Sequence, residues 1–419
     1  MSTSFSVQSV ETSSPVRAGA PLPRSPVFGW ASFEIVNAPG IACIEDLPFI
    51  LFTTSGRAAI HHALLQLQLP TGSTVLVPTY HCPTMVAPVI LANLQVAYFG
   101  ITSDGLPNLD SIDPRTADRC GAMIVSHYFG IANSLAQVRK WCDDNGIALI
   151  EDCAHCYFGQ AGERPIGSWG DFSTASLSKF LPVPEGGILA SASRHILSPA
   201  LQKPALKAEL KGWVDVVELA TKYKRLPGLN FLLTVGFRLK NARPGKHRGN
   251  GQVGTEAASK LLTASPIEDT TAARMMQTCD MARISEAPLA AFTWLRRLLP
   301  RGRIIAKRQR NYAAYSRHFK SVGGARPLFP NFGDSASQIA PYVFPLWVDD
   351  ADFVYRTLRA QDLPVFRWDR LWPGTSQLEH DVGLNWSCHV LQLLCHQDLD
   401  ETAINRTAHA VLSSLAINR

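Results

Sequence analysis

The sequence predicts an α/β protein with a large domain, built on a mostly parallel sheet, and a smaller α+β domain toward the C-terminal end. Short apolar strands alternate with helices between about residues 54 and 152, a pattern typical of a parallel sheet covered on both faces. Glycine and proline, 29 and 28 of 419 residues, supply the turns that many short elements need. The chain is 46% hydrophobic and 18% charged, which excludes a disordered or fibrous protein.

The first alternating units lie in residues 54–101. Residues 54–70 predict a helix, because a Thr-Ser-Gly start is followed by apolar residues at helical spacing and then by a proline. Residues 75–77 predict a short buried strand. A second helix is expected over 83–93, where a proline suits the first turn, and 95–101 predicts the next strand.

The next units bring polar residues to the ends of strands. Residues 122–126 predict a strand, and 134–144 predict a helix that is capped by Asn or Ser and stopped near a glycine. Residues 147–150 predict a strand that delivers Asp152 to its end. Ligands of open α/β sheets bind beyond the carboxyl ends of the strands. This rule selects His81, His127 and Asp152.

Longer helices and a few later strands characterise the rest of the chain. Helices are expected near 256–262, 272–284, 289–298, 305–319 and 401–415, and strands near 342–347 and 363–366. We therefore divide the chain into a flexible N-terminal tail (1–26), a large α/β domain (27–275) and a small C-terminal domain (276–419).

Positive charge is concentrated in residues 203–248, which hold eleven Lys and Arg against three acidic residues, although the whole chain carries only +6. We interpret this segment as a solvated basic insertion in the large domain, with a surface for a polyanion or a membrane as the alternative. The mild overall charge gives no indication of nucleic-acid binding. Residues 58–103 carry no Asp, Glu, Lys or Arg, but their prolines divide them into pieces too short to span a bilayer.

Cysteine usage and the N-terminal sequence predict a cytoplasmic protein. Nine cysteines are an odd number, and several lie in apolar stretches, so they do not suggest a disulfide framework. Residues 1–26 lack the apolar core of a signal peptide. Cys153 and Cys156 have CxxC spacing, but without a second Cys/His pair at short spacing they do not predict a metal site, and their context does not fit a thiol redox site.

The most informative residues are Asp152, His155 and Lys179. A carboxylate at a strand end, a nearby imidazole, and a lysine between Ser-rich and Gly-rich turns form the arrangement that pyridoxal 5'-phosphate (PLP) needs. A lysine holds the PLP aldehyde as a Schiff base, and a carboxylate keeps the pyridine nitrogen protonated, so that the ring accepts electrons. These residues therefore predict a PLP site.

Five motifs show that the chain resembles the DegT/DnrJ/StrS family of PLP-dependent aminotransferases, which act mainly on sugars and have the PLP-dependent transferase fold of type I. The resemblance runs from about residue 55 to residue 190 and more loosely beyond, through 308–312 and 342–345. The motifs are Ser55-Gly56-Arg57-Ala58-Ala59, Val77-Pro78-Thr79-Tyr80-His81-Cys82, His127-Tyr128-Phe129-Gly130, Glu151-Asp152-Cys153-Ala154-His155 and Gly167-Ser168-Trp169-Gly170-Asp171-Phe172.

The resemblance implies three catalytic residues. Lys179 is then the Schiff-base lysine and proton shuttle, Asp152 is the partner of the pyridine nitrogen, and His155 is a neighbour of the ring hydroxyl. It also implies that Gly56 and Arg57 bind the phosphate at a helix N-terminus.

Two positions of the cofactor site have several candidates. Ser176 and Ser178 are alternative hydroxyl ligands of the phosphate. The residue against the face of the ring is Cys82, Tyr80 or His81.

The function expected from this resemblance is transfer of an amino group, from glutamate, to a keto sugar carried on a nucleotide, for amino-sugar, polysaccharide or secondary-metabolite biosynthesis. The resemblance further implies a homodimer whose subunits complete each other's active sites. Two alternatives remain: a catalytically idle PLP-fold protein that binds a sugar or a partner, and a PLP-dependent sugar dehydratase.

Overall fold

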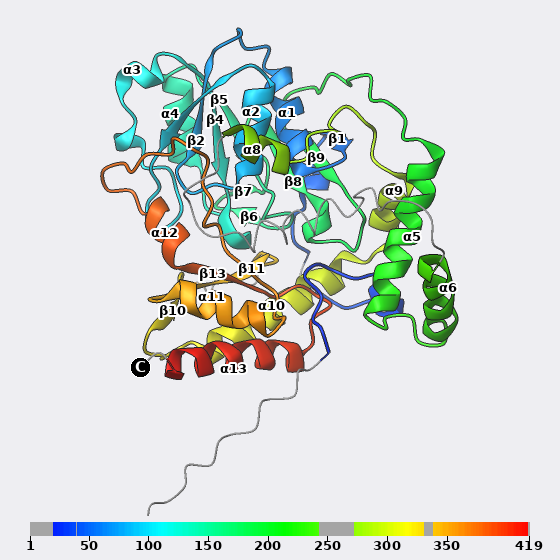
Figure 1. The fold of residues 1–419 in the computed structure, drawn as a ribbon. Helices are drawn as coiled ribbons and strands as arrows, with labels where there is room; N and C mark the ends of the chain where they lie inside the picture. Colours follow the sequence, from blue (N-terminus) through cyan, green and yellow to red (C-terminus); the bar gives the residue numbers. More distant parts are fainter. Residues whose placement is uncertain (1–19, 39, 243–271, 331–337, 418–419) are drawn as a thin grey trace, which may run out of the picture.

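The computed structural model describes residues 20–38, 40–242, 272–330 and 338–417. Its largest element is a seven-stranded sheet, and a four-stranded sheet lies beside it (Figure 1). The seven strands, in their order across the sheet, are β1 (Phe49–Thr53), β9 (Gly187–Ser191), β8 (Phe172–Ser176), β5 (Ala148–Asp152), β4 (Cys120–Ser126), β2 (Thr74–Pro78) and β3 (Gln95–Phe99).

The centre of the large sheet is parallel. Strand β2 pairs in parallel with β3 and β4, and β5 pairs in parallel with β4 and β8. Strand β9 runs antiparallel to both of its neighbours, β8 and β1. The predicted mostly parallel sheet is confirmed, and the carboxyl ends of β4, β5 and β8 meet at one edge, where ligands of such sheets bind.

Both faces of this sheet are buried. Successive residues of a strand point to opposite sides, so neighbouring residues of one strand show what covers each face. On β2, Val75 packs into one apolar cluster and Leu76 into the other. Helices α1 (Gly56–Gln66) and α2 (Pro83–Leu91) cover the first face, and α4 (Ala136–Asp144) covers the second. This two-sided burial explains the uncharged stretch at 58–103 without a membrane span.

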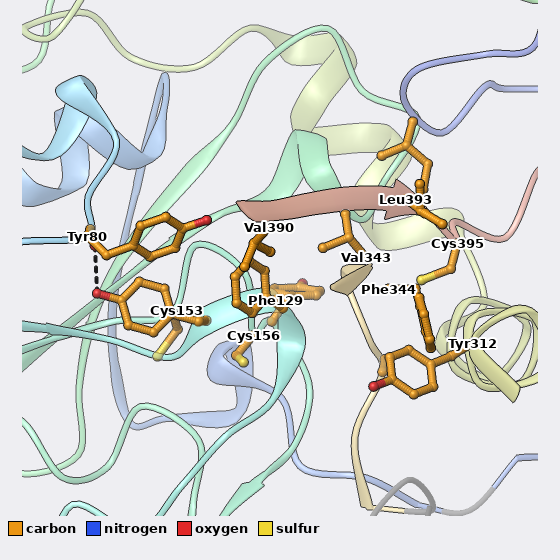
Figure 2. Close-up of a cluster of buried hydrophobic side chains, with 14 of the residues drawn as sticks. Tyr80, Phe129, Cys153, Cys156, Tyr312, Val343, Phe344, Val390, Leu393 and Cys395 are labelled. Atoms are coloured by element: carbon orange, nitrogen blue, oxygen red, sulfur yellow. Dashed lines mark hydrogen bonds between the residues drawn. The ribbon is translucent and has the colours of Figure 1, made fainter. Parts of the chain in front are cut away.

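The small sheet is antiparallel, and its apolar core is continuous with that of the large sheet. Figure 2 shows Tyr80, Phe129 and Cys153 from the large sheet's side close to Val343 and Val390 from the small sheet, all within one buried cluster. The small sheet comprises β10 (Ala325–Pro327), β11 (Val343–Val348), β13 (Val390–Leu394) and β12 (Val365–Phe366), with α10 (Arg301–His318), α11 (Ala351–Ala360), α12 (Gly383–His389) and α13 (Glu401–Ile417) around it.

The basic segment forms two helices as far as the structure describes it. Helix α5 (Leu206–Lys222) buries Val216 against Leu295 of α9 (Ala290–Leu298), and α6 (Asn230–Ala242) packs beside α5. Figure 1 shows both helices, in green, at the edge of the molecule on the side of α9. The shorter elements are α3 (Pro114–Ala117), β6 (Gln160–Ala161), β7 (Arg164–Pro165) and α8 (Ala272–Thr278).

Most predicted elements are present, with two corrections. The helix predicted over 272–284 ends at Thr278, because Asp280 has a left-handed backbone with φ of 48°. The helix predicted over 134–144 begins at Ala136, whose N–H bonds the Ser134 hydroxyl. The helix predicted at 256–262 and the basic residues Lys246 and Arg248 lie outside the described residues.

The domain boundary between 275 and 276 stays a prediction, since the two sheets share one core. Among the described residues, no helix combines the length and the apolar composition needed to cross a membrane.

Candidate active site

The candidate site lies at the carboxyl ends of β5 and β8. Asp152 is the last residue of β5 and is in register with Thr174 of the parallel neighbour β8. Strand β8 ends at Ser176, and the short 3-10 helix that follows ends at Lys179. Because adjacent parallel strands end at the same edge, this topology brings the carboxylate and the lysine together.

The Asp152 carboxylate is buried and held by three donors. Its Oδ1 accepts hydrogen bonds from the Ala154 N–H (3.0 Å) and the Thr174 hydroxyl (3.3 Å), and its Oδ2 accepts one from the Ser126 hydroxyl (3.4 Å). Burial raises the pKa of Asp152 above its usual value, although the positive charge of Lys179 opposes the shift. The carboxylate is therefore oriented by its three donors, and Lys179 is the largest electrostatic influence that favours its charged form.

The pKa of Lys179 is shifted in the opposite direction to that of Asp152. Burial lowers the pKa of its ammonium, while Cys82 and Asp152 oppose that shift. Its Nζ lies 5.2 Å from the centroid of the Tyr342 ring, over the ring face. A lysine with a lowered pKa holds a larger fraction of neutral amine near pH 7, which is the nucleophilic form.

His155 also lies against Tyr342. Its ring stacks on the Tyr342 ring with 4.4 Å between centroids, and its Nδ1 accepts a hydrogen bond from the Phe129 N–H at 3.3 Å. Burial, together with the charge of Lys179, lowers the pKa of His155 well below its usual value. The ring is therefore neutral with its proton on Nε2, which leaves Nε2–H available as a donor.

An anion cradle is formed where α1 begins. The Ser55 hydroxyl caps the Ala58 N–H, and the first-turn N–H groups of Gly56 and Arg57 have no partner inside the helix. A Cβ on Gly56 would lie 3.2 Å from the Cβ of Ser176, so the helix N-terminus lies close against the end of β8. The N–H groups of the first turn of α1 and the side chain of Ser176 thus lie close together, as a phosphate site requires.

Arg57 and Ser178, two further candidates for binding the phosphate, differ in their surroundings. The Arg57 guanidinium lies 3.6 Å from the Asp280 carboxylate, so its charge is shared with that residue. Ser178 is partly buried, two residues after Ser176 and on the same turn as Lys179.

The three candidates for the ring face differ in burial and in hydrogen-bond partners. Tyr80 is fully buried among aromatic rings, away from solvent. Both ring nitrogens of His81 are used, Nδ1 with the Pro78 carbonyl (2.9 Å) and Nε2 with the Trp372 N–H (3.0 Å), and burial lowers its pKa to about 4. Cys82, by contrast, is partly exposed. It is also the largest electrostatic influence that raises the pKa of Lys179.

His127 has a structural environment. Its Nε2 lies 2.9 Å from Glu151 Oε1, and the Glu151 carboxylate also accepts the N–H groups of Gly167 (2.8 Å), Trp169 (2.9 Å) and Gly170 (3.2 Å). Burial alone would raise the pKa of Glu151, but the bonds from His127 and the backbone lower it. The strand-end rule therefore selected His127 for its position, while its ring anchors a turn.

The CxxC cysteines are not in a redox environment. Cys153 and Cys156 are both buried, and burial raises the pKa of each thiol well above its usual value. Reactive cysteines have lowered pKa values and partial exposure. Cys153 also approaches His127 and Glu151 closely enough for the three to offer ligand atoms within 4.8 Å of one another, but the backbone donors already occupy the Glu151 carboxylate.

Sequence reasoning assigned no role to the residues that hold the lysine from the small sheet's side. The fully buried Arg308 of α10 donates from Nη2 to the Lys179 carbonyl (2.6 Å) and from Nη1 to the carbonyls of Pro341 (3.0 Å) and Tyr342 (3.2 Å). Gln397 accepts from Arg308 Nε at 3.0 Å and donates to the Phe180 carbonyl at 2.7 Å. The only signal in the sequence was the family-like pattern at 308–312 and 342–345.

Comparison with solved structures shows the type of fold. The model superposes on the Helicobacter pylori PseC aminotransferase of pseudoaminic acid biosynthesis with a TM-score of 0.59 and 15% identity, over 95% of this chain and 100% of that one. Bacillus subtilis NtdA with its bound cofactor PMP gives a TM-score of 0.53 and 14% identity, over 88% of this chain and 74% of that one. The fold is that of the PLP-dependent aminotransferases.

Sequence comparison agrees with this fold. Residues 46–233, somewhat less than half of the chain, match the model of the DegT/DnrJ/EryC1/StrS aminotransferase family. A GDP-perosamine synthase from Vibrio cholerae is 27% identical over 169 residues, 39% of this chain and 46% of that protein. The L-glutamine:2-deoxy-scyllo-inosose aminotransferase of Streptomyces kanamyceticus is 26% identical over 180 residues, 42% of each chain. The chain thus aligns with less than half the length of these two relatives.

Proposed function

We propose that this protein is a PLP-dependent aminotransferase that transfers an amino group from glutamate to a keto sugar carried on a nucleotide. One observation carries the proposal: Lys179 and Asp152 interact electrostatically at the adjoining ends of β8 and β5, and the Tyr342 ring links Lys179 to His155. An amine, an acid and a neutral imidazole in one place are the three polar groups that a pyridine aldehyde needs.

The residues present fit PLP. The first turn of α1, with Gly56 and Arg57, and the hydroxyls of Ser176 and Ser178 would hold the phosphate, since a cradle of backbone N–H groups and hydroxyls suits a dianion. Cys82 would lie against the face of the ring. When bound, PLP supplies an aldehyde that condenses with amines and an electron-poor ring that stabilises negative charge at carbon.

Each polar residue has a defined task in this chemistry. The Lys179 amine would be the nucleophile that holds PLP and would move a proton to and from the substrate carbon. The Asp152 carboxylate, fixed by Ala154, Thr174 and Ser126, would keep a proton on the pyridine nitrogen. The neutral His155 would donate its Nε2–H to the ring oxygen.

The names of similar proteins support the substrate class. The family and its named relatives, among them a GDP-perosamine synthase, include proteins named for nucleotide-linked sugars. We also propose that the protein works in the cytoplasm as a homodimer whose subunits share active sites. The presence of Lys179 argues against a catalytically idle binding protein, because transamination requires this amine.

The test uses the full chain with PLP. We expect a visible absorption band that borohydride reduction converts into a stable PLP adduct on Lys179, mapped by mass spectrometry. Lys179→Ala should lose the band, while the matched variant Lys140→Ala, an exposed lysine paired with Asp144, should keep it. An adduct on a different lysine would overturn the assignment.

The substrate is tested separately with a panel of keto sugars, free and nucleotide-linked, and with glutamate and glutamine as amino donors. Mass spectrometry should detect an amino sugar nucleotide with glutamate as donor. A PLP adduct on Lys179 without any amino sugar product would refute the substrate class and leave the cofactor assignment intact.

A further inference from the structure

Helices α5 and α6, here called the helix pair, expose large apolar side chains to solvent. On α5, Leu206, Leu210 and Trp213 follow one another at spacings of four and three residues and so lie on one face of the helix. Leu206 is 88% exposed, and the other two are also exposed. Isolated surface leucines are common, but an aligned series along a helix is a surface for contact.

Helix α6 is apolar on both of its sides. Its inner side packs toward α5 with half-buried Leu233, while Phe231 (78% exposed), Leu232 (67%) and Leu239 (65%) point outward together with Val235. A surface helix of a globular protein normally presents polar residues to water. Four large apolar residues on the outer face of one helix therefore need a partner that removes them from water.

The surface extends to the turn that joins the two helices. Trp30, which is exposed, donates from its indole nitrogen to the Pro227 carbonyl in that turn at 3.2 Å. Trp30 and Trp213 thus add amphipathic aromatic rings to the exposed apolar side chains of this part of the molecule. Tryptophan is the residue type enriched where protein meets the headgroup region of a membrane.

The helix pair carries an excess of positive charge. Residues 203–242 contain eight Lys and Arg but three acidic residues. Lys207 follows Leu206 directly, and Arg238 directly precedes Leu239, and both cations are exposed. One of the acids, Asp215, is already paired with Lys211 at 2.8 Å. The partner of this face should therefore be both apolar and negatively charged.

We propose that the helix pair binds the surface of an anionic phospholipid bilayer and holds the enzyme there as a peripheral protein. An amphipathic helix with apolar residues on one face and Lys or Arg beside them lies in the interface plane, with its apolar side about 5–10 Å below the headgroups. A second copy of this chain is the poorer partner, because a symmetric contact would set the same cations against each other. The structure thus favours the membrane alternative for the basic segment over a solvated insertion.

Vesicle flotation with the full protein tests this inference. We expect binding to vesicles of phosphatidylcholine with phosphatidylglycerol, no binding to phosphatidylcholine alone, and weaker binding as salt is raised. The double variant Phe231→Glu/Leu239→Glu should weaken binding at least about tenfold, because both side chains would leave the bilayer. The double variant Lys207→Gln/Arg238→Gln should also weaken it about tenfold.

Matched controls separate the helix pair from the rest of the surface. Ile417→Glu removes another exposed apolar residue, and Lys320→Gln removes another exposed cation, and both should leave vesicle binding unchanged. Absence of binding to anionic vesicles would overturn the proposal. A fall in the molar mass of Phe231→Glu/Leu239→Glu relative to the wild type, measured by light scattering, would also overturn it and show that a second copy covers the face.

Discussion

Replacing Arg308 by methionine should strongly destabilise the protein. The side chain is fully buried, and burial lowers its pKa to about 10, so the guanidinium is charged at pH 7 but costly to desolvate. It donates four hydrogen bonds, to the carbonyls of Lys179, Pro341 and Tyr342 and to Gln397. A methionine, which is shorter and apolar, would remove every donor and take these bonds from acceptors in the core.

The expected size of the effect follows from those four bonds. Bonds from a charged donor contribute about 1.5–3 kcal/mol each, so their sum is on the order of 6–12 kcal/mol. The variant no longer desolvates a guanidinium, which returns several kcal/mol. We therefore expect Arg308→Met to lose about 3–5 kcal/mol of unfolding free energy, a large share of the roughly 5–15 kcal/mol that a protein has.

Urea unfolding followed by tryptophan fluorescence measures this loss. Arg310→Met is the matched control, because Arg310 is exposed on the same helix and its replacement should change stability by less than about 0.5 kcal/mol. Arg308→Lys keeps the charge with fewer donors and should fall between the two. The variant Arg308→Met should also incorporate PLP more slowly, because the Lys179 carbonyl has lost its anchor. A loss below about 1 kcal/mol for Arg308→Met would refute the reasoning.

Two further predictions concern the site and the basic segment. Asp152→Asn should lose far more turnover than PLP occupancy, because a neutral amide no longer stabilises a protonated pyridine; near-normal turnover would contradict this role. Burial raises the pKa of Asp152 in the folded protein, so its contribution to stability is present at low pH and is lost as the pH rises through that pKa. Without cofactor, Asp152→Asn should therefore have a higher melting temperature than the wild type at neutral pH but not in acid. Neutralising Lys240, Lys246 and Arg248 together should leave transamination of a soluble substrate largely intact, and a large loss of turnover with PLP still bound would show that this segment reaches the active site.

The sequence allowed the large sheet and its functional edge to be predicted because both depend on local patterns. Apolar runs such as 75–77 and 147–150 lie between helix-length segments, and this alternation determines a parallel sheet. The strand-end rule then selected Asp152, which the structure places beside Lys179. The same rule selected His81 and His127, whose rings turn to backbone and carboxylate partners, because position along a strand does not determine what a side chain bonds.

The residues that sequence reasoning missed act over long separations in the chain. Arg308 reaches the Lys179 carbonyl across 129 positions, and Tyr342 enters the site from a sheet of different topology. No local period encodes such contacts, since they depend on how the two sheets pack. The helices of the basic segment were not predicted, although Leu206, Leu210 and Trp213 of α5 have helical spacing.

The neighbouring acids Glu151 and Asp152 make the correct register of strand β5 more stable than a shifted one. Consecutive side chains of a strand point to opposite faces, so Glu151 meets the turn at Gly167–Gly170 while Asp152 meets Lys179. If β5 slipped by one residue in one direction, Glu151 would take the place of Asp152 and Ile150 would face the backbone donors. A slip in the other direction would bring Cys153 into the site and leave Asp152, the shorter acid, too far from those donors. Both errors would leave buried polar groups without partners, so the same pair that equips the chemistry also penalises misassembly of the sheet.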